Sequence, residues 1–143
     1  MKKIKEQFHQ VHFILDEYQL LSTIQKLENK YSIERFQFQG GKGNHSLAVC
    51  LRKLIIHQEI CWYPGCGQLP DREDRDDLET ELSSLLLKQK PNGYCRIDHI
   101  QDGRHHDDRS FALGAAALHL ETQATGQEWM EVTPSTVMEN WSW

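Results

Sequence analysis

The sequence predicts an α/β domain, a mostly parallel sheet of three to four strands with helices packed on it. Segments of strand length alternate three times with segments whose apolar residues recur at helical spacing. Glycine, proline and asparagine separate these segments, for example at residues 40–44 and 91–93. Because strand and helix alternate, parallel pairing with right-handed crossovers is the simplest arrangement.

The first part of the chain shows this alternation clearly. Residues 11–15 form a short apolar run that ends at Asp16, as expected of a buried strand. Apolar residues then recur at helical spacing over residues 17–30. Residues 33–39, with aromatic side chains at alternate positions, predict a second strand.

A glycine-rich segment at residues 40–44 interrupts the chain after the second strand. Asn44 or Ser46 can cap the amphipathic helix that follows it. Residues 59–62 predict a short third strand, and the charged run at 70–77 is a solvated lead-in to another helix.

The remaining elements follow in the same manner. Leucines from Leu78 to Leu86 predict a helix, and residues 94–100 predict a further strand. A polar loop then leads to an almost wholly apolar helix over residues 111–120. An apolar circumference implies burial on most sides, so we expect this helix to be the most buried one. Gly114 would let it lie very close to the sheet.

Length and composition indicate one domain over residues 1–121 and a peripheral tail over 122–143. The formal net charge of −5 means that any contact with nucleic acid is a local patch. No apolar run approaches the roughly 18–20 residues that span a bilayer, and residues 1–7 precede no apolar signal segment. Four cysteines fit a reducing compartment. We therefore expect a soluble, cytoplasmic protein with no membrane partner.

Three carboxylates occupy positions where metal ligands occur. Asp16 ends a strand, and Asp107 and Asp108 open the apolar helix. Parallel sheets place their chemistry at the carboxyl ends of strands, and phosphodiester hydrolysis with two Mg²⁺ ions needs several converging carboxylates. N-capping is the alternative, because aspartate accepts from the free N–H groups of a first helical turn. One cap needs one aspartate, so the pair at 107–108 favours the metal hypothesis.

The glycine-rich segment and the cysteines are weaker candidates. The segment lacks the Gly-Lys-Ser/Thr ending of a phosphate-binding P-loop and predicts a plain turn, in which Lys42 can still touch a nucleic-acid backbone. His57, Cys61 and Cys66 form one loose cluster, with Cys50 or Cys95 as a fourth ligand. Structural zinc sites usually have two tight pairs, so the spacing does not favour zinc.

Three passages resemble the nuclease domain of phage terminase large subunits, in the RNase H/RuvC-like superfamily. The segment VHFILDEYQ at 11–19 resembles the family's strand that ends in an acidic residue before a long helix. The segment FQFQGGKGN at 36–44 resembles the next strand and loop, and HDDRSFALGAA at 106–116 resembles the signature that opens the last helix. LETEL at 78–82 and GYCRID at 93–98 also match in order.

The resemblance implies a truncated RNase H-like fold and an endonuclease that depends on Mg²⁺ or Mn²⁺ and acts on DNA during phage DNA packaging. Asp16, Asp107 and Asp108 would hold the ions, and three basic residues would face the phosphates. These basic residues are Lys42, Arg104 and Arg109. The implied location is the cytoplasm of a bacterial host or a phage-infected cell.

The chain departs from the family at its start. Met1 lies just before the strand that matches the family's fourth, so the aspartate of the first strand has no counterpart, and no Walker A sequence of a terminase ATPase occurs. We therefore expect weak metal binding and little cleavage by the chain alone. The alternative is a non-catalytic scaffold that binds a protein partner or itself through a free sheet edge.

Overall fold

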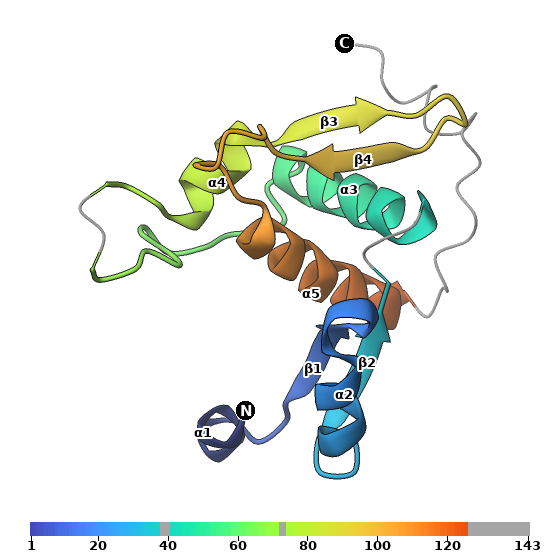
Figure 1. Ribbon diagram of the computed structural model, residues 1–143, viewed down its shortest axis with the longest axis vertical. Coiled ribbons are helices and arrows are strands. Elements are labelled where there is room, and N and C mark those ends of the chain that lie inside the picture. The colour runs from blue at the N-terminus through green and yellow to red at the C-terminus, as the bar shows by residue number, and fades with distance from the viewer. Residues whose placement is uncertain (38–40, 72–73, 126–143) are drawn as a thin grey trace. The chain divides into compact units, whose positions relative to one another are not determined.

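The computed structural model describes residues 1–37, 41–71 and 74–125. In these residues the chain forms five helices and two small sheets, one parallel and one antiparallel (Figure 1). It divides into two compact units, Met1–Gly40 and Gly41–Trp143, and each unit is described by itself. The fold is mixed α/β, as predicted, but a mostly parallel sheet of three to four strands is not confirmed.

The first unit contains the predicted strand–helix–strand segment. Its elements are α1 (Lys2–Gln7), β1 (His12–Asp16), α2 (Glu17–Leu27) and β2 (Ser32–Phe36). Strands β1 and β2 pair in parallel, with His12 opposite Ser32 and Asp16 opposite Phe36. The sequence did not predict α1. The last two residues of the predicted second strand, 38–39, lie outside the described residues.

Apolar side chains hold α2 and the strands of the first unit together. Ile24 of α2 is fully buried, and the rings of Phe13 and Tyr31 meet edge to face with centroids 5.6 Å apart. The helix is kinked at Leu20, whose φ of −119° and ψ of 17° are not helical. The apolar spacing of the sequence therefore gives the correct helix but not its kink.

The second unit contains the longer helices and a β-hairpin. Its elements are α3 (Gly41–Ile56), α4 (Leu78–Ser84), β3 (Leu86–Gln89), β4 (Cys95–Asp98) and α5 (Asp108–Thr125). Figure 1 shows α3 and α5 side by side, with the hairpin of β3 and β4 over α3. The buried apolar side chains of this unit come from α3, α4, β4 and α5. They are Leu47, Ala48, Cys50, Leu51, Leu54, Leu78, Cys95, Ile97, Ala115, Ala117 and Leu118.

The expectation that α5 is the most buried helix is wrong. Helix α3 buries more side chains, and α5 leaves Ala112, Ala116 and Leu120 exposed. The close approach predicted at Gly114 is to a helix: a Cβ there would lie 2.6 Å from Cδ2 of Leu47 in α3. Small residues thus mark a contact surface of α5, but the sequence does not reveal which element fills it.

Helix α3 begins at Gly41, so neither Asn44 nor Ser46 caps it. Instead, the Asn44 side chain accepts a hydrogen bond from the N–H of Ile97 at 2.9 Å. Nδ1 of the neighbouring His45 accepts from the N–H of Cys95 at 3.0 Å. Cys95 and Ile97 are alternate residues of β4, so their N–H groups point to the same edge of the strand, the edge that faces away from β3. The side chains of Asn44 and His45 thus supply the hydrogen-bond acceptors that this edge lacks in the hairpin.

Two further predictions are wrong. Residues 59–62 do not form a strand, and the leucine-rich helix ends at Ser84, so that Leu86 begins β3. A short apolar run fits a helix and a strand equally well. Here the turn after Lys90 reverses the chain and pairs β3 with β4 in the antiparallel sense.

The end of the predicted domain also differs from the structure. Helix α5 continues to Thr125, past the expected boundary at residue 121. Residues 126–143 of the predicted tail, as well as residues 40 and 72–73, lie outside the described residues. No helix in the described part of the chain is long and apolar enough to cross a membrane.

Candidate metal centre

Asp16 is the last residue of β1, as predicted. Its Oδ1 atom accepts a hydrogen bond from the N–H of Tyr18 at 2.8 Å. This bond satisfies one of the free N–H groups in the first turn of α2. The capping interpretation of Asp16 therefore has direct structural support.

The start of α5 is capped in another way. Asp107 precedes the helix and Asp108 is its first residue, so a capping side chain would accept from the second or third helical N–H. The third belongs to Ser110, and it donates to Oε1 of Glu81 in α4 at 2.6 Å. Glu81 thus takes the place of a local cap, and the Asp107 carboxylate lies elsewhere.

Asp107 lies beside the end of β4. Its Oδ2 is 3.0 Å from Nδ1 of His99, which follows Asp98, the last residue of that strand. One ligand atom from each of these three residues lies within 4.8 Å of the other two. A strand end and a helix start therefore bring two carboxylates and an imidazole together inside the second unit.

Charge is partly balanced in this Asp98–His99–Asp107 cluster. The Asp98 side chain, only 11% exposed, is 2.9 Å from Nζ of Lys88 and 3.6 Å from a guanidinium nitrogen of Arg96. The hydrogen bond from Lys88 lowers the pKa of Asp98. The Asp107 carboxylate raises the pKa of His99, against the opposing effect of burial. Nδ1 of His99 is itself shielded from solvent and faces this carboxylate.

A second histidine–aspartate contact lies in the loop before α5. Oδ1 of Asp102 accepts the backbone N–H groups of Arg104 and His105 at 2.9 and 3.0 Å, and Nδ1 of His105 is 2.8 Å from Oδ2. The two backbone hydrogen bonds lower the pKa of Asp102. Among the described residues no third ligating side chain joins this pair, which is a closed local turn.

The predicted phosphate contacts have different surroundings. Arg109 forms ion pairs with Asp76 at 3.0 Å and with the buried Glu81 at 3.1 Å, and the second pair links α5 to α4. Because its guanidinium already has these two partners, Arg109 is a poor candidate for binding phosphate. Arg104 is exposed in the loop before α5. Lys42 is also exposed, but on the first turn of α3 instead of in a loop.

The cysteines do not form a metal cluster in the described part of the chain. Cys50 and Cys95 are buried in the apolar core, whereas Cys61 is exposed and Cys66 is half-buried. Burial raises the pKa of Cys50 to about 11, so its thiol stays protonated at neutral pH.

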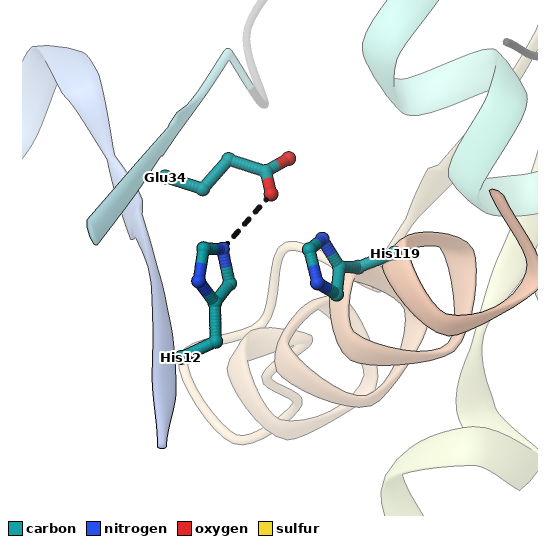
Figure 2. A group of neighbouring side chains, drawn as sticks. All are labelled: His12, Glu34 and His119. Atoms are coloured by element: carbon teal, nitrogen blue, oxygen red, sulfur yellow. Dashed lines mark hydrogen bonds and ion pairs between the residues drawn. The ribbon is translucent and has the colours of Figure 1, made fainter. Parts of the chain in front are cut away.

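A cross-strand pair in the first unit also contains a histidine and a carboxylate. Nε2 of His12 is 3.1 Å from Oε2 of Glu34, as Figure 2 shows, and Nδ1 of His12 is 2.7 Å from the Ser32 hydroxyl. His119, also drawn there, belongs to α5 of the second unit and is not part of this pair. The pair links β1 to β2 and is explained by sheet pairing.

Asp16 belongs to the first unit, whereas Asp107 and Asp108 belong to the second. Their predicted convergence on shared metal ions depends on the arrangement of the two units, and it stays a prediction. The structure does bring Asp107 close to Asp98 and His99. The sequence analysis singled out neither Asp98 nor His99. The available signal was position, since Asp98 ends a strand in the same way as Asp16.

Comparisons of the chain with protein-family models, with curated proteins and with solved structures find no match. The resemblance to terminase nucleases is therefore one of motif order and spacing in the sequence alone.

Proposed function

We propose that the chain is part of a metal-dependent DNA endonuclease domain of the terminase, RNase H/RuvC-like type. In this proposal β1 and β2 belong to a mostly parallel sheet of three to four strands, and Asp16, Asp107 and Asp108 are the metal ligands. The observation that carries the proposal is the cap of α5: because Glu81 accepts from Ser110, helix capping does not account for the Asp107 carboxylate.

The donor set fits the implied ions. Carboxylate oxygens are the ligands that Mg²⁺ and Mn²⁺ prefer, and two aspartates in sequence at the amino end of α5 supply them from a rigid element. Two bound ions would activate the attacking water and stabilise the leaving oxygen. Lys42 and Arg104 supply the local positive charge that a chain with a net charge of −5 needs to hold a phosphate backbone.

Residues 1–143 contain no counterpart of the family's first-strand aspartate, so the chain alone has an incomplete ligand set. Metal catalysis of phosphodiester cleavage requires both ions to be fixed relative to the phosphate. Weak binding of Mn²⁺ is compatible with two or three carboxylates, because such ions retain several waters. We expect cleavage of plasmid DNA to stay near background.

The test is Mn²⁺ binding and Mn²⁺-dependent plasmid nicking by the purified chain and by Asp16→Asn and Asp108→Asn. Both variants should weaken Mn²⁺ binding and remove any nicking above the metal-free level. Asp102→Asn is the matched control, because asparagine also forms the local turn seen at this residue. If Asp16→Asn and Asp108→Asn bind Mn²⁺ as the wild type does, the nuclease proposal is rejected.

A second function, self-association without catalysis, is favoured by the exposed strand β3. In the described residues β3 pairs only with β4, and its leucines Leu86 and Leu87 are exposed. Leu87 lies opposite Ile97, whose N–H binds α3, so the N–H of Leu87 also points away from the hairpin. An outward N–H on an exposed edge can pair with a second copy.

Sedimentation velocity over a range of concentrations tests this second function. A dimer is expected, and Leu87→Pro should abolish it because proline removes the outward donor but no hydrogen bond of the hairpin. Leu87→Val, which retains the N–H, is the control. A monomer at every concentration would reject self-association.

A further inference from the structure

We propose that Asp98, His99 and Asp107 bind one divalent transition-metal ion, with Zn²⁺ and Co²⁺ as suitable probes. The site lies between the end of β4 and the start of α5 and needs neither Asp16 nor Asp108. It therefore does not depend on the proposed nuclease function, although both proposals use Asp107.

The spacing of the three side chains fits one ion. Two ligands bound about 2.1 Å from an ion lie about 3.0 Å apart at a right angle and about 3.4 Å apart at the tetrahedral angle that zinc prefers. Nδ1 of His99 and Oδ2 of Asp107 are 3.0 Å apart. The limit of 4.8 Å that includes Asp98 is compatible with ligands on opposite sides of an ion.

The position of His99 between two carboxylates is the observation that points to a ligand. Its Nδ1 is shielded from solvent and lies 3.0 Å from Oδ2 of Asp107, where it forms an ion pair when the imidazole is protonated. A metal ion would accept the lone pair of this nitrogen in place of a proton. The same atom faces the carboxylate of Asp107, so both ligands are directed to one place.

The neighbouring elements hold the ligands in position. Asp98 ends a strand whose outer edge is bound to α3 by Asn44 and His45. Asp107 precedes a helix that Glu81 caps from α4. Ligands on the ends of packed elements lose little freedom on binding, and this favours a site over a transient surface contact.

An imidazole ligand determines the class of metal. Nitrogen from histidine suits Zn²⁺ and the other first-row transition ions, whereas Mg²⁺ prefers oxygen. One nitrogen and two carboxylate oxygens leave at least one position for water, as in catalytic zinc sites. The proposed site should therefore bind Zn²⁺ or Co²⁺ more tightly than Mg²⁺.

Lys88 acts as the counter-ion of the metal-free site. Its Nζ is 2.9 Å from Oδ2 of Asp98, and its side chain is 54% exposed, so it can turn into solvent when a cation takes its place. A positive group beside a ligand opposes metal binding by repulsion and by occupying the oxygen. Removing this charge without shortening the chain should strengthen binding about tenfold, the scale on which groups around metal ligands act.

The experiment is a titration of the full chain with Co²⁺, followed by absorption, and with Zn²⁺, followed by calorimetry. The wild type should bind one ion, and His99→Gln and Asp107→Asn should each weaken binding at least tenfold. Lys88→Met should strengthen it. His105→Gln is the matched control, because His105 contacts Asp102 at a similar distance but forms no group of three ligating side chains within the described residues.

The variants separate this proposal from the nuclease. Asp16→Asn and Asp108→Asn should weaken Co²⁺ binding less than His99→Gln does, even where they weaken Mn²⁺ binding. The proposal is overturned if His99→Gln binds Co²⁺ as the wild type does, if His105→Gln has the larger effect, or if Mg²⁺ competes equally with Zn²⁺. Circular dichroism of each variant checks that the fold is retained.

Discussion

Helices α2 and α5 both follow an aspartate, yet the two aspartates have different roles. At α2 the Asp16 side chain accepts the N–H of Tyr18 two residues ahead. At α5 the N–H of Ser110, three residues after Asp107, binds Glu81 of another helix, and Asp107 contacts His99 instead. An aspartate before a helix is thus a cap only where no distant side chain takes the N–H first.

Glu81 should have the largest effect on stability. Its side chain, 2% exposed, accepts from Ser110 and pairs with Arg109, so Glu81→Ala leaves a partly buried guanidinium with Asp76 alone. Breaking a buried ion pair by removing one partner costs about 3–5 kcal/mol. Urea unfolding measures the loss. Glu79→Ala in the same helix is the control, because that side chain is 61% exposed and should change stability by under about 1 kcal/mol.

Gly114 tests whether α5 is fixed against α3. Gly114→Leu should lower the unfolding free energy by roughly 1–3 kcal/mol, because the first added carbon already collides with Leu47. Ala116→Leu, on the exposed side of the same helix, should be nearly neutral. Equal melting temperatures for the wild type and Gly114→Leu would show that this helix contact is misplaced.

Alanine substitution of the aspartate before α2 and of the aspartate before α5 should lower the free energy of unfolding by different amounts. Asp16→Ala removes a cap and should cost about 1 kcal/mol, whereas Asp16→Asn should cost little because asparagine caps equally well. Asp107→Ala removes only a partly exposed ion pair and should cost less than Asp16→Ala. Chemical denaturation of these variants checks the order, and the reverse order would mean that Asp107 is the cap.

Helix α4, like α2, is capped by the aspartate before it, and this cap should make a small contribution to the free energy of unfolding that depends on pH. Its cap, Asp77, accepts the N–H of Thr80, and the guanidinium of Arg75 together with that N–H lowers the pKa of Asp77 to about 2. Because the pKa of Asp77 is lower in the folded state, its carboxylate stabilises the fold at a pH above the ordinary pKa near 3.8. This stabilisation is lost as the pH falls towards 2. Unfolding midpoints from pH 5 to pH 2 should therefore fall less steeply for Asp77→Asn than for the wild type.

The sequence predicts the local elements better than the contacts between them. The apolar run before Asp16, the helical spacing in residues 17–30 and the alternating aromatic residues of 33–39 are local signals, and β1, α2 and β2 follow from them. Leu86 belongs to a strand because of its partner Asp98 across the hairpin, and this partner is distant in sequence. Asn44 likewise appears as a cap in the sequence but binds a strand more than fifty residues away.

The candidate site shows the same limit. The acidic pair at 107–108 singled out Asp107, which the structure places beside Asp98 and His99, whereas its convergence with Asp16 stays a prediction. His99 was missed because a histidine after a strand has no distinctive spacing, and the role of Glu81 depends on how α4 packs on α5. Charge patterns indicate which residue types are available, but only packing decides which N–H or cation each carboxylate meets.

Amide hydrogen exchange at Tyr18 and Ser110 tests the difference between the two junctions most directly. In Asp16→Ala the amide of Tyr18 should exchange faster than in the wild type, because its acceptor is gone. In Asp107→Ala the amide of Ser110 should retain its protection, because Glu81 remains as acceptor. Loss of protection at Ser110 in Asp107→Ala would contradict the account, since Asp107 would then be the cap and its carboxylate would not be available to a metal ion.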